Sequence, residues 1–335
     1  MVRRRDRREY SGPLASDIVI RDARKEDNQA LIELDRQCVM GGTIQLVFDR
    51  SPDFFARSRA YESFRMCVAE EEGTLIGVGG VTVKSLRVNG IRQRWAYFYD
   101  LRVHPSHRRR GVAGLIANAL VDGIRDAGIT NAYSLVIEGN APSESFVEMR
   151  GSIPFKGCAL ALLSGEAGAT RLERIPHVSN EVASLLEATY RSYHFTPPWD
   201  PEMLHGTLDR LTPLGWQGMY GRRAQKGWGL CFGLWDYSSV MQMTFRGRGA
   251  EMHARPFFLY PLGWQDPQWL VDGLRAAQAV IASGGTLLLP YVPGDPVSAV
   301  IPEDAFRLGM TLYVRRLAPE EVQTDGFVFI DPADL

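Results

Sequence analysis

The chain has 335 residues, of which 45% are hydrophobic, and its 38 Lys and Arg against 39 Asp and Glu leave a net charge of -1. This apolar content suffices for two ordinary domains, each with its own core. The balanced charge excludes a general attraction to nucleic acid or to an anionic membrane. We therefore expect a globular protein without nucleic-acid or membrane partners, in which any anion site is local.

The cysteines and the N-terminus indicate the compartment. Cys38, Cys67, Cys158 and Cys231 lie far apart without metal-binding or redox spacing, so buried free thiols are expected. No apolar run reaches the roughly 18 residues of a membrane span, and no signal-peptide hydrophobic region follows the Arg-rich start. These features predict a cytoplasmic protein. Residues 1–16 are predicted to form a disordered basic arm, with contact to nucleic acid or acidic lipid as the alternative.

The first half of the chain reads as a mixed α/β unit. A strand at 18–20 and a helix at 25–38, with apolar residues at helical spacing, open it. A second helix is predicted from Ser51, with Pro52 in its first turn. Strands follow at 65–69, 75–83 and 94–103, the last two joined by a hairpin at Asn89-Gly90. A helix at 111–127 closed by Gly128, a strand at 132–138, a helix at 141–150 and a strand at 156–163 complete this half.

The second half repeats this order. Helices are predicted at 180–193 and from Pro201, and strands at 217–222, 227–235, 253–262 and 286–289. The tetrapeptide Leu-Val-Asp-Gly at 120–123 recurs at 270–273, at the same place in the order. We therefore predict two domains, 17–165 and 170–335, joined by the Gly/Ala-rich stretch 165–170. An unrelated α+β domain in the second half is the alternative.

One motif carries chemistry. The strand at 94–103 leads through His104 and Pro105 into Arg108-Arg109-Arg110-Gly111-Val112-Ala113-Gly114, where a helix begins. Glycines allow close approach of a diphosphate, and the free amides and dipole of a helix start favour an anion. No dinucleotide fingerprint and no GxxxxGK[ST] loop is present. The motif predicts an anion site, with a solvated arginine run before a helix as the alternative.

This motif resembles a known signature. Arg108-x-x-Gly111-x-Ala113 is similar to the Q/R-x-x-G-x-G/A signature of the GNAT superfamily of N-acetyltransferases, with the usual lead-in at Leu101, Val103 and Pro105. Downstream, the family's Asn…Ala…Tyr…Gly pattern is resembled by Asn140, Ser143, Phe146 and Gly151. Residues 47–110 more weakly resemble Hookless-type acetyltransferases of plants. The resemblance covers the first half and implies a GNAT fold, a mixed central sheet with flanking helices, followed by a degenerate GNAT-like domain.

The resemblance implies acetyl-CoA as cofactor. The backbone of the strand would bind the pantetheine arm together with Asn140, and the helix start would hold the pyrophosphate. The implied cofactor residues are Leu101, Arg102, Val103, Arg108, Arg109, Arg110, Gly111, Val112, Ala113, Gly114 and Asn140. A primary amine of a small molecule or peptide would attack the thioester directly in a ternary complex, where the neighbouring strands splay apart. Whether the protein forms a homodimer is left open.

The proton that the amine loses needs an acceptor. Strand alternation predicts Tyr97 and Tyr99 on one face with Leu101 and Val103, where they would act as base or hold water, although core packing is the alternative. Glu138 is the best carboxylate candidate, since burial near an apolar substrate would raise its pKa, and a solvated loop carboxylate is the alternative. The family's general-acid tyrosine corresponds to Val147. A non-catalytic acyl-CoA-binding regulatory module is therefore the alternative function.

Two further regions concern the acceptor. The loop at 40–50 is expected to contact it, with Phe48, Phe54 and Phe55 enclosing an apolar body and Asp49 or Asp53 pairing with an ammonium; helix-cap and core roles are the alternative. In the second half, the equivalent strand-to-helix turn at 260–269 lacks the arginines. We expect this half to bind no pyrophosphate and to help wall the acceptor site.

Overall fold

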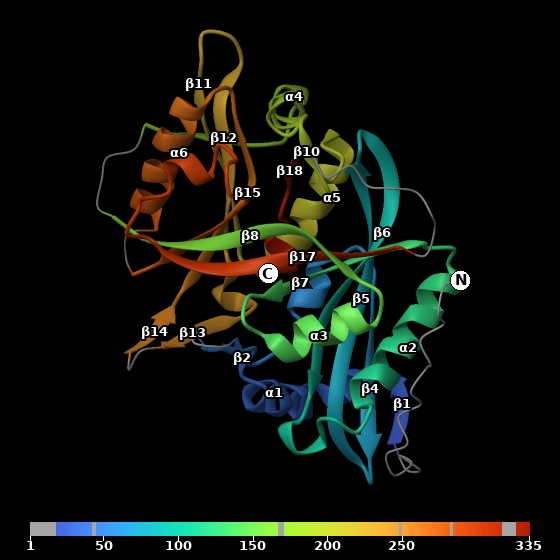
Figure 1. Cartoon of the computed structure of the whole chain (residues 1–335). Coiled ribbons are helices and arrows are strands. Elements are labelled where there is room, and N and C mark those ends of the chain that lie inside the picture. Colours follow the sequence, from blue (N-terminus) through green and yellow to red (C-terminus); the bar gives the residue numbers. More distant parts are fainter. Residues whose placement is uncertain (1–17, 42–44, 167–170, 248–249, 282–283, 317–325) are drawn as a thin grey trace, which may run out of the picture.

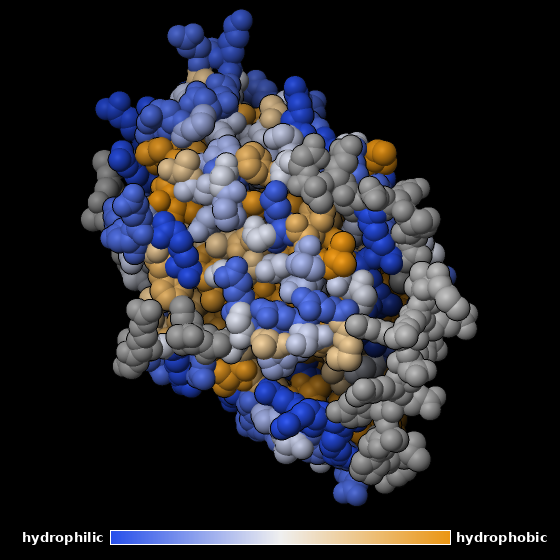
Figure 2. Space-filling model, in the orientation of Figure 1, coloured by the Kyte–Doolittle hydropathy of each residue, from blue (hydrophilic) through white to orange (hydrophobic). Residues whose placement is uncertain are grey.

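The computed structural model describes residues 18–41, 45–166, 171–247, 250–281, 284–316 and 326–335. The predicted basic arm at 1–16 and most of the predicted linker at 165–170 lie outside these ranges. Within the described ranges no helix is long and apolar enough to span a bilayer. Hydrophilic residues dominate both ends of the molecular surface in Figure 2, with smaller hydrophobic groups between them.

A single twelve-stranded sheet runs through both halves of the chain (Figure 1). Its order is β1-β4-β5-β6-β7-β17-β8-β16-β15-β12-β11-β9. The first half supplies β1 (Ile18–Asp22), β4 (Phe64–Glu71), β5 (Thr74–Val88), β6 (Ile91–Val103), β7 (Asn131–Ile137) and β8 (Ile153–Ser164). The second supplies β9 (Glu173–Ile175), β11 (Trp216–Arg223), β12 (Trp228–Asp236), β15 (Pro256–Trp264), β16 (Thr286–Tyr291) and β17 (Phe306–Arg316).

The strand order is a palindrome of the two halves. Each strand has its counterpart at the mirrored position, β1 with β9, β4 with β11, β5 with β12, β6 with β15 and β7 with β16. At the centre the halves exchange strands, because β17 pairs with β7 and β8 pairs with β16. The mirrored order agrees with the predicted repetition. The exchange buries the inner sheet edges of both halves, which leaves only β1 and β9 as outer edges of the described sheet.

Helices cover both faces of the sheet. They are α1 (Asn28–Gln37), α2 (Val112–Asp126), α3 (Ala141–Met149), α4 (Asn180–Thr189), α5 (Pro201–Leu211) and α6 (Pro267–Val280). The face of β4 that carries Cys67 and Ala69 packs against α2 in a small core, and the face that carries Met66 and Val68 joins a larger core shared with α1 and the second half. The strand alternation of the first half therefore separates the two faces, as periodicity predicts.

The predicted helix from Ser51 is wrong. The chain there makes turns and a 3₁₀-helix at Arg57–Ala60. The side chains of Asp49, Asp53 and Asn28 accept hydrogen bonds from backbone N–H groups between Ser51 and Phe55, at 2.8–3.0 Å. Such local bonds give the backbone an alternative to the helical ladder, which the apolar spacing does not reveal.

Three other boundaries differ from prediction. The loop at 40–50 contains β2 (Met40–Gly41) and β3 (Gln45–Asp49), which join β13 (Gln242–Gly247) and β14 (Ala250–Ala254) in a four-stranded sheet. The predicted strand 253–262 is broken, because β14 belongs to that small sheet and β15 to the large one. The predicted helix 180–193 ends at Thr189, and β10 (Tyr193–His194) pairs with β18 (Phe327–Val328). The first and third differences arise from pairing between distant segments, β3 with β13 and β10 with β18, which overrides local periodicity, whereas β14 pairs with its chain neighbour β13.

Candidate active site

The strands β6 and β7 separate after a short parallel contact. They pair only at Ala96 with Ala132 and at Tyr97 with Tyr133. Beyond Tyr97, β6 continues to Val103 without a described pairing on this side, while the other edge of β7 pairs with β17. The sheet therefore contains an opening whose closed end, here called the vertex, is the Tyr97–Tyr133 pair.

A bulge in β6 corrects the predicted side-chain directions. Gly80 pairs with Tyr99, whereas Val78 pairs with Arg102, so β6 carries an extra residue, and Asp100 has a φ of 53°. An extra residue reverses the alternation beyond it. Tyr97 and Tyr99 lie in the larger core, but Leu101 and Val103 pack on the α2 side. The prediction that all four side chains share one face is wrong for this reason.

A buried charge network holds the bulge. Asp100 accepts hydrogen bonds from Arg50 Nη2 at 2.7 Å and Arg57 Nη1 at 2.8 Å. Arg102 pairs with Asp35, whose Oδ2 lies 3.2 Å from Arg50 Nε. Burial alone would raise the pKa of Asp100, but the charges of Arg50 and Arg57 hold it well below its usual range. The Arg102 side chain is thus structural, which leaves only its backbone for the predicted cofactor contact.

The start of α2 is open. Gly111 is the N-cap with a φ of 81°, and no side chain caps the helix. The first-turn amides therefore lack the acceptors that a cap would provide. A Cβ added at Gly111 or at Gly114 would meet no atom within 4 Å. The predicted residues Gly111, Val112, Ala113 and Gly114 thus present a helix start with open space beside it, which suits an anion.

The three arginines before this helix have different partners. Arg110 donates two hydrogen bonds to the Glu71 carboxylate, at 2.6 and 2.9 Å. Arg108 Nε donates to the carbonyl of Val103 at 3.3 Å. Arg109 is exposed with a φ of 62°, and no described carboxylate pairs with it. Arg110 is thus paired with a carboxylate, whereas Arg108 and Arg109 have no described carboxylate partner and are the cations available to a phosphate, a distinction that the sequence could not supply.

The predicted tyrosines act as hydrogen-bond donors in the structure. Tyr97 Oη donates to the backbone carbonyl of Asp334 at 2.5 Å, and Tyr99 Oη donates to Ser58 Oγ at 3.0 Å. Burial raises the pKa of both phenols. At neutral pH neither phenol would lose its proton, so a role as general base is disfavoured.

Glu138 and Asn140 lie at the far end of β7. Glu138 is exposed; its backbone N–H donates to the carbonyl of Gly309 at 3.0 Å, and its carboxylate lies where a Cβ at Gly309 would be. Asn140 is the N-cap of α3, and its side chain makes no capping hydrogen bond. Both residues therefore flank the opening on the side opposite to β6, and the role of Asn140 as a pantetheine contact stays a prediction.

The expected acceptor-loop residues have structural partners. Asp49 pairs with Arg36 at 3.1 Å, and Asp53 pairs with Arg59. Phe48 and Phe54 are buried in the larger core, and Phe55 packs against it. The cap and core alternative describes these residues, whereas the ammonium-binding role has no support from these contacts.

No sequence pattern points to a group of residues that the structure brings together near the vertex. The Asp334 carboxylate accepts hydrogen bonds from Tyr133 Oη at 2.8 Å and Lys84 Nζ at 2.9 Å, and Lys84 also binds Asp331 at 2.6 Å. Tyr61 Oη donates to the carbonyl of Ala333 at 2.7 Å. Tyr133 and Lys84 lie about 200 residues or more from Asp334 and Asp331 in the sequence. Neither periodicity nor a motif could connect them.

The second half repeats the opening without the anion site. β15 and β16 pair in parallel only from Pro256–Thr286 to Phe258–Leu288, and the register of β12 and β15 shifts between Phe232 and Leu234. At the start of α6, however, the Asp266 carboxylate accepts a hydrogen bond from the N–H of Gln268 at 3.0 Å. A carboxylate at the helix start repels a second anion. That this half binds no pyrophosphate stays a prediction.

Comparison with known proteins agrees with this geometry. Residues 29–151 match the model of the acetyltransferase (GNAT) family. The first half of the chain therefore contains a domain of the GNAT acetyltransferase family. No curated protein gives a significant match to the sequence.

Solved structures share its fold across both halves. N-myristoyltransferase of Saccharomyces cerevisiae with bound myristoyl-CoA has a TM-score of 0.60 at 11% identity, over 90% of this chain and 83% of that one. A putative acetyltransferase from Pyrococcus horikoshii has 0.59 at 10% identity, over 96% and 98%. A GCN5-related N-acetyltransferase from Anabaena variabilis has 0.52 at 13% identity, over 90% and 73%. At these identities the likeness concerns the fold alone.

Proposed function

We propose that this GNAT protein transfers an acetyl group from acetyl-CoA to a primary amine of a small molecule or peptide, within a ternary complex. The observation that carries the proposal is the opening between β6 and β7, with the uncapped start of α2 beside it. The amides from Gly111 to Gly114 would hold the pyrophosphate, and Arg109 would reach a phosphate. The backbone from Leu101 to Val103 and the Asn140 side chain would hold the pantetheine arm from opposite sides.

Direct attack fits the state of the cysteines. All four are buried, as the sequence predicts. Burial raises the pKa of Cys67 to about 11 and the pKa values of Cys158 and Cys231 to about 12, and the pKa of Cys38 is raised as well. The thiolate is the nucleophilic form of cysteine, so none of these thiols is prepared to form an acyl-enzyme. The amine itself must attack the thioester.

For the amine's first proton we propose Glu138. Its exposed carboxylate can accept a proton from an entering ammonium and pass it to solvent without a buried route. Tyr97 and Tyr99 would shape the vertex as donors. No hydroxyl stands at Val147, so the leaving thiolate would take its proton from solvent, which a good leaving group tolerates.

The two halves of the chain would have different roles in binding the cofactor and the acceptor. We propose residues 17–165 as the cofactor domain and 170–335 as a degenerate domain that completes the sheet and walls the acceptor site, in a cytoplasmic protein that binds neither nucleic acid nor membrane. The exchanged strands β8 and β17 favour such a joint unit, because neither half closes its sheet alone.

A second candidate function differs in the length of the acyl chain on the donor. The N-myristoyltransferase with the same fold binds myristoyl-CoA, so a longer acyl group is the second candidate.

The test is a turnover assay with the full chain. Release of coenzyme A is measured for acetyl-, octanoyl- and myristoyl-CoA, each with a panel of primary amines that includes small molecules and peptides. The proposal expects turnover with acetyl-CoA and at least one amine. Faster turnover with myristoyl-CoA would show that myristoyl-CoA, rather than acetyl-CoA, is the preferred acyl donor. Binding of acyl-CoA by calorimetry without release of coenzyme A would instead favour the regulatory module.

A further inference from the structure

A continuous chain of short contacts leads away from the vertex. Tyr133, which pairs with Tyr97 at the vertex, donates its hydroxyl proton to Asp334 Oδ2 at 2.8 Å. Asp334 Oδ1 accepts from Lys84 Nζ at 2.9 Å, and the same ammonium donates to Asp331 Oδ2 at 2.6 Å. All three distances are those of charge-assisted or strong hydrogen bonds. Every link of this chain is therefore within proton-transfer reach.

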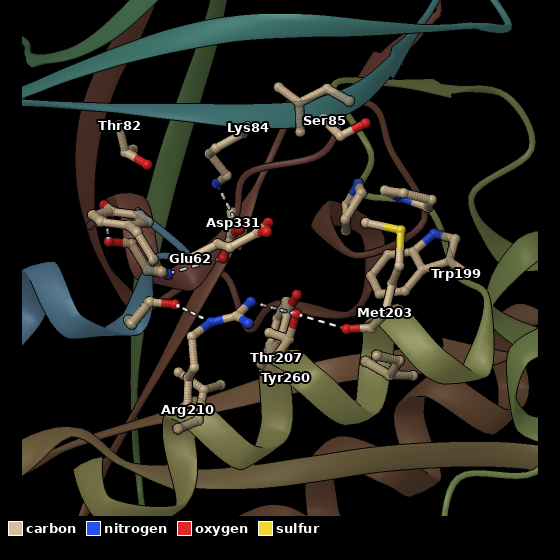
Figure 3. A pocket seen from close by; sticks show the side chains of 18 of the residues that line it. Glu62, Thr82, Lys84, Ser85, Trp199, Met203, Thr207, Arg210, Tyr260 and Asp331 are labelled. Atoms are coloured by element: carbon tan, nitrogen blue, oxygen red, sulfur yellow. Dashed lines mark hydrogen bonds and ion pairs between the residues drawn. The ribbon is translucent and has the colours of Figure 1, made fainter. Parts of the chain in front are cut away.

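The chain ends at a cavity. A space of about 90 Å³ lies between β5, α5 and the segment Asp331–Ala333, and both Lys84 and Asp331 line it. Figure 3 shows Lys84 and Asp331 pointing toward one another, with Trp199 and Met203 on the other side of the cavity. Such a volume holds a few water molecules, and its lining offers them polar partners. The cavity thus gives Asp331 a water-accessible neighbour.

We propose that Tyr133, Asp334, Lys84 and Asp331 form a relay that carries a proton from the reaction centre to this cavity. The inference rests on the proposed acyl transfer. An ammonium loses two protons when it becomes an amide: the first before attack, to Glu138 in our proposal, and the second after the C–N bond has formed. The C–S bond then breaks, and the thiolate takes one proton from solvent. One proton is released in total, and the relay would carry the second proton of the nitrogen.

The side chain of each residue in the relay can accept and pass on a proton. Tyr133 would accept the nitrogen's proton on its oxygen while it passes its own proton to Asp334, so no phenolate forms. Burial raises the pKa of Tyr133, which opposes any lasting loss of its proton. Burial also raises the pKa of Asp334, which brings this carboxylate closer to neutral pH as an acceptor. Although burial opposes the charge on Lys84, Asp331 and Asp334 raise its pKa, so it stays an ammonium between transfers. In the relay it gives a proton to Asp331 first, which frees the nitrogen lone pair to accept the proton from Asp334.

Other charged groups surround the central carboxylate and set its response to pH. Lys84 from β5, Tyr97 from β6 and Tyr133 from β7 contact Asp334, and Tyr61 Oη lies 3.4 Å from its Oδ1. Arg57 donates to the neighbouring carbonyl of Ala333 at 3.3 Å. Asp331, Tyr237 and Tyr260 also interact with this carboxylate through charge. Of its hydrogen-bond partners, Lys84 at 2.9 Å and Tyr61 at 3.4 Å also line the cavity, and the shorter contact, continued to Asp331, is the path that we propose.

A purely structural role of Asp331 is separable from proton transfer by chemical rescue. In Asp331→Ala, turnover with acetyl-CoA and the best amine of the panel should fall about 10- to 100-fold in kcat, with an unchanged KM for acetyl-CoA. Formate, a small base that fits the cavity, should restore kcat. Nitrate has a similar shape and charge but is no base, and should not. Rescue by both anions would show that only the negative charge beside Lys84 matters, and would overturn the relay.

The matched control is Glu62→Gln. Glu62 lines the same cavity but is no link in the chain, so kcat should stay at the wild-type value and respond to neither anion. A loss of kcat in this variant equal to that in Asp331→Ala would contradict a specific path through Asp331.

A second measurement needs no turnover. The carboxylic-acid stretch of protonated Asp334, identified by its loss in Asp334→Asn, is followed by infrared spectroscopy after mixing into D₂O at acidic pH. The relay predicts slower exchange in Asp331→Asn than in the wild type, and equal rates would overturn it. A wild type that releases no coenzyme A would refute the acyl transfer, whereas fast exchange would still show that the buried chain conducts protons.

Discussion

Tyr97 and Tyr133 face one another across the last parallel pair of β6 and β7, with ring centroids 4.9 Å apart. Both hydroxyls bind the same residue, Tyr97 the carbonyl and Tyr133 the carboxylate of Asp334. The point at which the sheet opens is therefore fixed by a residue from the other end of the chain. Changes near this pair should affect stability and catalysis together, whereas changes at the start of α2 should affect cofactor binding.

Gly111→Val should abolish acetyl-CoA binding. The side chain would enter the open space beside the helix start, where the pyrophosphate is proposed to lie. The φ of 81° adds a strain of roughly 1–2 kcal/mol. Calorimetry should show a loss of affinity of about 100-fold or more, together with a lower Tm.

The matched control for strain is Gly128→Val. Gly128 follows the other end of α2 with a φ of 70°, and a Cβ there also meets no atom within 4 Å. This variant should lose a similar amount of stability and keep its affinity for acetyl-CoA. Equal affinities in the two variants would exclude the start of α2 as the pyrophosphate site.

Arg109→Gln should weaken acetyl-CoA binding more than Arg110→Gln. Arg110 is bound to Glu71, whereas Arg109 is exposed without a described carboxylate partner. A charge-assisted hydrogen bond to phosphate contributes about 1.5–3 kcal/mol, so about a tenfold or greater loss is expected for Arg109. Calorimetry at two salt concentrations should show a reduced salt dependence for this variant. A larger loss in Arg110→Gln would reverse the assignment.

Asp100→Asn should destabilise the fold by about 3–5 kcal/mol, because buried Arg50 and Arg57 would lose a charged partner. The folded-state pKa of Asp100 lies below its unfolded value of about 3.9. Its contribution is then complete above pH 4 and is lost as the pH falls below that value. Urea unfolding should give a constant difference between wild type and variant from pH 8 to 5, and a smaller one in more acidic buffer.

The exposed pair Asp49–Arg36 is the control for this measurement. Asp49→Asn should cost at most about 1 kcal/mol, as exposed ion pairs do. A similar cost for Asp100→Asn would show that the buried network contributes no more than a surface pair.

The candidates at the opening can be ranked by kinetics. Glu138→Gln should lower kcat/KM by about 10²-fold or more with an unchanged Tm, since the residue is exposed. Tyr97→Phe and Tyr99→Phe should cost about 1 kcal/mol of stability each and change kcat less than tenfold, because their hydroxyls donate to protein acceptors. A pH profile in which the rise of the rate with increasing pH disappears in either tyrosine variant would restore the phenol as base.

The sequence by itself determined the cofactor half of this protein. The glycines and arginines from Arg108 to Gly114, and the strand and helix around them, are adjacent in the chain, so local spacing suffices to predict an anion site there. The repeated order of elements and the buried cysteines were predictable for the same reason, because periodicity and composition report on local burial.

The tertiary structure alone decided the rest. The bulge at Asp100 shifts one residue of a strand, which no alternation pattern reveals, and it sends Leu101 to the face opposite Tyr99. The exchange of β8 and β17, and the contacts of Lys84 and Tyr133 with Asp334, join segments that are distant in sequence. Such contacts depend on how buried polar groups find partners in the folded chain, so only the three-dimensional arrangement shows which residues meet at the vertex.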